Sequence, residues 1–121
     1  MINNIIKLIR IKDWLKNLII FLPLVFSGNI NNTSHYFNLL LAFFLFCLIS
    51  SIIYIINDLK DIDSDKSHLL KIHIKPLASG LLSKKIAIII LLFFSSLIIF
   101  LLIQYTIIIY HLFLYLVING K

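Results

Sequence analysis

Long apolar runs dominate the chain and are separated by polar stretches of very different character. Residues 36–56 carry no charged side chain and are long enough to cross a hydrocarbon core of about 30 Å as one helix. Residues 86–103 form a second uncharged run, and a shorter one, 105–118, follows directly after Gln104. Because Gln104 is strongly polar and lies between those two runs, we expect two helices joined by a tight turn; the alternative is one long helix that leaves the membrane.

The N-terminal apolar segment is harder to assign because Pro23 lies inside it. Residues 15–30 together have the length of a tilted span, and neighbouring helices can satisfy the backbone at a proline kink. With 57–85 as a polar loop, the runs predict an all-α fold. It is a single transmembrane domain over residues 1–121, with about four helices in a multi-pass bundle. Composition agrees, because 61% of the residues are hydrophobic and 13% are charged, against about 25% charged in soluble domains.

The basic residues predict how the chain is oriented. Of the 11 Lys and Arg residues, four precede Leu18, six lie between Lys60 and Lys85, and one ends the chain, whereas residues 27–35 contain none. Cytoplasmic loops are enriched in basic residues, so we expect both termini and the 57–85 loop on the cytoplasmic side of the inner cell membrane. The net charge of +6 then indicates pairing with anionic lipid, and we expect no nucleic acid partner.

Four of the five acidic residues crowd into positions 58–65, just after the second apolar run. If the helix continues beyond Ile56, one arc of about 100° holds the side chains of Asn57, Asp58, Asp61 and Asp65. Mg²⁺ prefers carboxylate and amide oxygens, above all where substrate phosphates complete its coordination shell. We therefore expect Asp58, Asp61 and Asp65 to hold a metal–diphosphate group, with Asn57 as a polar neighbour. The alternative is a solvated acidic helix end without a ligand.

Basic side chains follow the acidic cluster along the same loop. If the ligand of that cluster is a diphosphate, Lys71 and Lys75 are expected to contact its phosphate oxygens as point charges. The alternative is that these lysines orient the loop toward the cytoplasm and bind nothing. Lys75 precedes Pro76, which disfavours a helical conformation at that point.

The motif at residues 57–65 resembles the NDxxDxxxD signature of the UbiA-type intramembrane prenyltransferase superfamily. Its flanks are similar to those of one branch, decaprenyl-phosphate phosphoribosyltransferase, also called DPPR synthase. The matching segments are RIKDWLKN at 10–17, SSIIY at 50–54 and KPLASG at 75–80. The resemblance covers residues 9–83, roughly two-thirds of the chain.

The resemblance implies a Mg²⁺-dependent transferase of cell wall biosynthesis. In the phosphoribosyl branch, phosphoribosyl pyrophosphate gives its 5-phosphoribosyl group to a polyprenyl (decaprenyl) phosphate in the membrane and releases pyrophosphate. Carried onto this chain, the catalytic metal ligands are Asp58, Asp61 and Asp65. The residues that the resemblance assigns to substrate phosphate are Lys16, Asn17, Asn57, Lys71 and Lys75.

The chain also departs from the family pattern. The family has more spanning helices and a second polar motif, so this chain resembles its N-terminal part, and we expect a second chain to supply the missing helices. Where the family shows Arg-Pro, this chain has Lys75-Pro76, which loses bidentate phosphate geometry. Two alternatives stay open: transfer of a prenyl group from a prenyl diphosphate to an aromatic acceptor, and a truncated membrane fragment without activity. A divalent-cation carrier ranks last, because its carboxylates would lie inside the spans.

Overall fold

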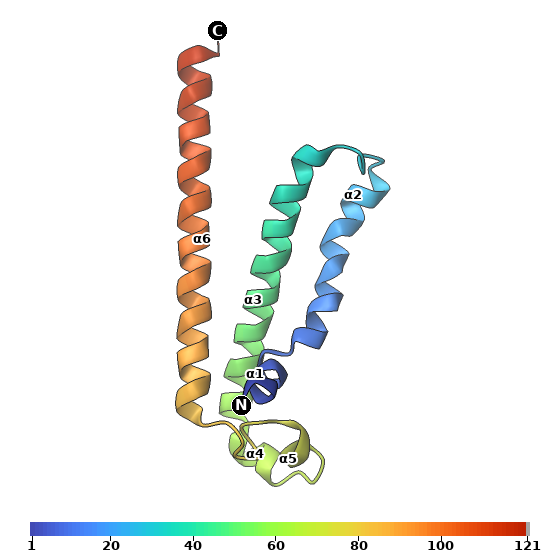
Figure 1. Cartoon of the computed structure of the whole chain (residues 1–121), viewed down its shortest axis with the longest axis vertical. Helices are drawn as coiled ribbons and strands as arrows, with labels where there is room; N and C mark the ends of the chain where they lie inside the picture. Colours follow the sequence, from blue (N-terminus) through green and yellow to red (C-terminus); the bar gives the residue numbers. More distant parts are fainter. Residues whose placement is uncertain (121) are drawn as a thin grey trace.

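The computed structural model describes residues 1–120, and every regular element among them is helical. The predicted all-α fold is thereby confirmed. In chain order the elements are α1 (Ile2–Ile9), the 3-10 helix η1 (Ile11–Phe21), α2 (Leu22–Phe26), the 3-10 helix η2 (Thr33–His35), α3 (Tyr36–Lys60), α4 (Ile62–Lys66), α5 (Lys71–Ile74) and α6 (Lys84–Asn119). Figure 1 shows that the short helices α1, α4 and α5 gather at one end of the long ones.

The central element of the bundle is α3, which packs against η1 and against α6. The chain runs along η1 and α2, turns at residues 27–35 and returns antiparallel to them along α3 (Figure 1). α4 and α5 follow, and α6 then runs away from the same end of the bundle. This order brings the N-terminal segment next to the last turn of α3, where Arg10 contacts Asp58 although the two are 48 residues apart in sequence.

Two helical stretches are long and apolar enough to cross a membrane, Thr33–Lys60 and Lys84–Asn119. Large apolar side chains along α6 are mostly exposed, and Ala87 is the fully buried residue on this helix within the described range. Monomeric soluble proteins rarely expose contiguous apolar surface on this scale, so the surface of α6 fits lipid or further helices.

The turn expected at Gln104 is absent, because α6 is one continuous helix through that residue. The two predicted spans, 86–103 and 105–118, therefore belong to a single element, which ends far from the 57–85 loop and does not return the chain to the side of that loop as expected (Figure 1). The physical reason is that residues 84–119 contain neither Gly nor Pro, and a lone amide side chain does not interrupt the backbone hydrogen bonds. Its 36 residues reach about 54 Å at 1.5 Å per residue, which exceeds a hydrocarbon core of about 30 Å.

The first predicted span, 15–30, overlaps η1 and α2, which together cover Ile11–Phe26. Eleven of these sixteen residues are 3-10 helix, which rises about 2.0 Å per residue, so the two elements together reach about 30 Å. Pro23 stands in the first turn of α2, where its missing N–H leaves no hydrogen bond unmade. Gly28, with φ of +70°, then turns the chain in a conformation that favours glycine.

The buried apolar core lies at the end of the bundle where the short helices gather. It joins α1, α3, α4, the segment before α6, and the start of α6 through Leu8, Ile55, Ile62, Leu77, Leu82 and Ala87. Two hydrogen bonds tie the N-terminal segment to α3 next to this core: Trp14 Nε1 donates to Ser51 Oγ (3.0 Å), and Ser51 Oγ donates to the Ile9 carbonyl (2.7 Å). The core thus holds in place the elements that carry the acidic motif.

Candidate functional site

The acidic motif is divided between two helices. α3 ends at Lys60, and Asp61, with φ of −93° and ψ of 8°, leads into the short helix α4. Asp58 in the last turn of α3 is 3% exposed and Asp65 in α4 is 1% exposed, whereas Asp61 is exposed. The motif therefore does not follow the continuous helix assumed from sequence, and two of the three expected carboxylates turn inward.

A lysine ammonium group lies between the two buried carboxylates. Lys75 Nζ is 2.8 Å from Asp58 Oδ1 and 2.6 Å from Asp65 Oδ2, and its side chain is 18% exposed. Lys75 ends α5 in an extended conformation, φ −91° and ψ 119°, which the following Pro76 favours. The loop after α4 therefore turns back so that its lysine bridges both helices.

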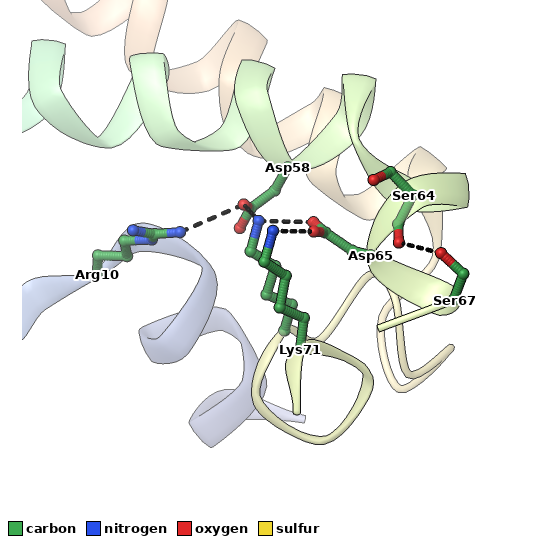
Figure 2. A network of polar contacts seen from close by, with 7 residues as sticks. Arg10, Asp58, Ser64, Asp65, Ser67 and Lys71 are labelled. Atoms are coloured by element: carbon green, nitrogen blue, oxygen red, sulfur yellow. Dashed lines mark hydrogen bonds and ion pairs between the residues drawn. The ribbon is translucent and has the colours of Figure 1, made fainter. Parts of the chain in front are cut away.

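Two further cations flank this bridge, as Figure 2 shows. Arg10 Nη2 donates to Asp58 Oδ1 at 3.3 Å, and the guanidinium lies over the Tyr54 ring, 4.2 Å from its centroid. Lys71 Nζ lies 3.2 Å from Asp65 Oδ1 (Figure 2). Two buried carboxylates thus contact three basic groups, which leaves the cluster with one net positive charge.

The ion pairs hold both partners of the central contact in their charged forms. The hydrogen bond from Lys75 lowers the pKa of the Asp65 carboxyl below its ordinary value of 3.8, against the opposing effect of burial. Burial lowers the pKa of Lys75, but hydrogen bonds with Asp58 and Asp65 outweigh it and raise that pKa above 10.5. Asp65 Oδ1 is buried and accepts no hydrogen bond within residues 1–120, because its 3.2 Å contact with Lys71 lacks the geometry of one.

A cavity of about 520 Å³ opens beside the bridge, between the N-terminal segment and the loop after α4. Its volume is in the range of small-molecule binding sites. The charged side chains that line it are Lys7, Arg10, Lys12, Asp13, Asp58, Lys71 and Lys75. Since basic groups outnumber carboxylates five to two, the cavity favours an anionic ligand.

The residues predicted from sequence to contact phosphate lie in different places. Lys71 and Lys75 line the cavity. Lys16 is exposed and pairs with Asp13 at 2.9 Å. Asn17 Nδ2 donates to Ser50 Oγ at 3.4 Å, in the contact between η1 and α3.

Asn57 is exposed on the last turn of α3 and is not among the residues that line the cavity. Sequence reasoning missed three basic residues that do line it, Lys7, Arg10 and Lys12. The available signal was their position, on the same predicted side of the membrane as the acidic motif.

The donor atoms of the cluster suit a hard divalent cation, with one qualification from the geometry. Carboxylate oxygens of Asp58 and Asp65 converge on one point, as Mg²⁺ requires of its protein ligands. That point is taken by the Lys75 ammonium group. Asp61 does not join them, and residues 1–120 contain no group of three His, Cys, Asp or Glu side chains placed to hold a metal.

In a comparison with known protein families, residues 18–119 match the UbiA prenyltransferase family. A decaprenyl-phosphate phosphoribosyltransferase from Corynebacterium glutamicum is 35% identical over 82 residues, covering 66% of this chain and 24% of the relative. The enzyme of that name from Mycolicibacterium smegmatis is 32% identical over 91 residues, covering 72% and 28%. Nodulation protein NoeC from Azorhizobium caulinodans is 40% identical over 74 residues, covering 61% and 24%.

The chain spans about a quarter of the length of these curated relatives. No solved structure matches it at a comparable level of similarity.

Proposed function

Because the chain belongs to the UbiA prenyltransferase family, we propose that it carries the metal–diphosphate half of a transferase site that acts on a polyprenyl phosphate. Its family and its two long apolar helices make it a membrane protein. The proposed reaction moves the 5-phosphoribosyl group of phosphoribosyl pyrophosphate to the lipid phosphate and releases pyrophosphate. The relatives from Corynebacterium glutamicum and Mycolicibacterium smegmatis, both named decaprenyl-phosphate phosphoribosyltransferase, support this choice.

One observation carries the proposal: Asp58, a buried carboxylate of the acidic motif, lines a cavity rich in basic side chains, and the buried Asp65 pairs with two of its lysines, Lys71 and Lys75. A diphosphate donor needs both features, since its phosphates carry negative charge that cations must balance. Bound there by Asp58 and Asp65, Mg²⁺ would supply neutralisation of the charge that develops on the pyrophosphate leaving group.

The basic residues of the cavity have the complementary role of binding and orienting the diphosphate. Arg10 offers a planar guanidinium fixed by Tyr54 and Asp58, while Lys7, Lys12 and Lys71 offer flexible ammonium groups. Positioning of this kind lowers the barrier because the donor is already aligned with the lipid phosphate when bond cleavage begins. Asp61, exposed where α3 ends, is proposed to help hold the metal ion of the same metal–diphosphate group from outside the buried pair.

The remaining part of the site is proposed to come from further helices, on a second chain or on a continuation of this one. The apolar surface of α6 is available to them. By the distribution of Lys and Arg, we place the cavity on the cytoplasmic side of the inner membrane, where a soluble phosphorylated sugar is accessible.

Transfer of label tests the proposal. Membranes that contain the chain are incubated with Mg²⁺, decaprenyl phosphate and phosphoribosyl pyrophosphate labelled in the ribose. Where the membranes also supply the further helices that complete the site, labelled lipid is expected, and it is expected to be lost in Asp58→Ala and Asp65→Ala but kept in the exposed control Asp63→Ala. Transfer from a labelled prenyl diphosphate to an aromatic acid would assign the alternative activity instead.

Binding separates an inactive fragment from a wrong assignment. If no label is transferred, the purified chain is still expected to bind Mg²⁺–pyrophosphate, and Asp58→Ala is expected to abolish that binding. Absence of both transfer and binding contradicts the proposal.

A further inference from the structure

The Lys75 ammonium group occupies the position at which a bound cation would contact both Asp58 of α3 and Asp65 of α4. It lies 2.8 Å from Asp58 Oδ1 and 2.6 Å from Asp65 Oδ2, two oxygens that come from different elements. Asp65 also has a buried oxygen, Oδ1, that accepts no hydrogen bond in the described part of the chain. Its nearest cation is the half-exposed Lys71 ammonium group at 3.2 Å, so this oxygen is ion-paired but is not held by a hydrogen bond.

We propose that Lys75 is an internal counter-ion of the metal site, so that this placement of its ammonium group and a divalent cation at Asp58 and Asp65 exclude each other. The inference rests on the proposed function, which puts a divalent cation at these carboxylates. Its physical basis is repulsion: an ammonium group and a divalent cation that share the same two oxygens would lie within a few ångströms of each other in a poorly solvated place.

The surroundings allow Lys75 to move while the carboxylates stay in place. Arg10 holds Asp58 from the side of the N-terminal segment, and Lys71 holds Asp65 from the loop. Lys75 itself lines the cavity, and its side chain is a flexible four-carbon stem. When Lys75 moves away from the two carboxylates, its ammonium group therefore enters the cavity that we assign to the diphosphate.

This movement couples the two ligands. A displaced Lys75 loses two ion pairs, and an anion in the cavity is the partner that replaces them. When a divalent cation binds alone, the displaced Lys75 loses its two ion pairs and gains no new partner. When the cation binds together with a diphosphate, the displaced ammonium group pairs with the diphosphate instead. Each ligand raises the affinity for the other, as linkage requires.

Binding of Mn²⁺ without any phosphate tests the exclusion. The full chain is placed in phosphatidylcholine nanodiscs, and free Mn²⁺ is measured by electron paramagnetic resonance. Lys75→Met is expected to bind Mn²⁺ about tenfold more tightly than wild type. The control Lys60→Met removes an exposed lysine that lies outside the cavity, and it is expected to match wild type.

The possible results separate this inference from the proposed function. Equal Mn²⁺ affinity in Lys75→Met and wild type, with binding lost in Asp58→Asn, overturns the inference and leaves the metal site standing. No Mn²⁺ binding in any folded variant, with or without pyrophosphate, overturns both. A gain in Lys75→Met that Lys75→Arg does not share supports exclusion by charge, since arginine keeps the positive group.

A measurement on the wild-type chain serves if Lys75→Met fails to fold. Acetylation of lysine amines is followed by mass spectrometry, with exposed Lys60 as the internal reference. Lys75 is expected to react slowly in metal-free buffer, because its ammonium group is paired twice, and several-fold faster at saturating Mn²⁺. An unchanged ratio of the two rates while Mn²⁺ is bound overturns the proposal.

Discussion

Asp58 and Asp65 are buried together although an exposed carboxylate, Asp61, stands between them in sequence. The cause is the break at Asp61, where α3 ends and α4 begins. A lysine of the following loop then meets both carboxylates at ion-pair distance. The acidic motif therefore connects two helices, and its buried carboxylates fix their relative position through Lys75.

Neutralising either buried carboxylate should destabilise this end of the bundle. Asp58→Asn and Asp65→Asn each remove one partner of a buried ion pair, for which losses of about 3–5 kcal/mol are typical. Asp63→Asn changes an exposed residue and should stay within about 0.5 kcal/mol of wild type. Thermal denaturation in detergent, followed by circular dichroism, measures the difference. Equal melting of Asp65→Asn and Asp63→Asn would contradict the ion-pair network.

Stability should depend on pH in two separate ranges. The pKa of Asp65 is lowered in the folded chain, so its contribution is complete above its ordinary value of 3.8 and is lost as the pH falls through the lowered value. The pKa of Lys75 is raised, so its contribution is complete below 10.5 and is lost as the pH rises through the raised value. A melting temperature that is flat between these limits is expected.

Variants separate the acid and alkaline limbs of that profile. Asp65→Asn should lose the part of the acid limb that Asp65 causes, and Lys75→Met should lose the corresponding part of the alkaline limb. An acid limb that is unchanged in Asp65→Asn would show that other carboxyl groups cause it.

The basic residues missed by sequence reasoning should bind anions. Lys7→Gln and Lys12→Gln are each expected to weaken binding of inorganic pyrophosphate by up to about fivefold, since exposed charges contribute about 0.2–1 kcal/mol. Isothermal titration calorimetry at low salt measures this, and the effect should shrink as salt rises. The matched control is Lys84→Gln, an exposed lysine at the start of α6 that does not line the cavity. A loss of the same size in that control would indicate general charge attraction.

The continuity of α6 can be measured directly. Spin labels at Ile88→Cys and Leu116→Cys, in a Cys47→Ala background, lie twenty-eight residues apart on one helix, which predicts about 42 Å between their backbone positions. A helical hairpin turning at Gln104 would bring the same positions within about 20 Å. Double electron–electron resonance distinguishes the two distances, and the short one would contradict the single helix.

Apolar patterning predicted the long helix after residue 36 well, because an uncharged run of that length has one stable form in lipid. The turn that it predicted at Gln104 is wrong, because a polar side chain alone does not interrupt a helix as Gly or Pro can. The three-carboxylate arc assumed that α3 continues, whereas the chain breaks at Asp61.

The position of Lys75 between the two carboxylates could not be predicted from the local sequence pattern. It depends on how the loop after α4 folds back against the ends of α3 and α4, and on Arg10 arriving from the N-terminal segment. Such contacts join residues far apart in sequence, and helical periodicity contains no information on them. The residue types of the motif could be recognised, but which of them face one another could not.

The most direct test asks whether Asp58 and Asp65 together hold a divalent cation in the presence of pyrophosphate. Mn²⁺ bound to the full chain in nanodiscs is measured with pyrophosphate present, for wild type, Asp58→Asn, Asp65→Asn and the exposed control Asp63→Asn. The account predicts bound Mn²⁺ in wild type and Asp63→Asn, and its loss in the other two. Binding that persists in folded Asp58→Asn and Asp65→Asn would contradict it.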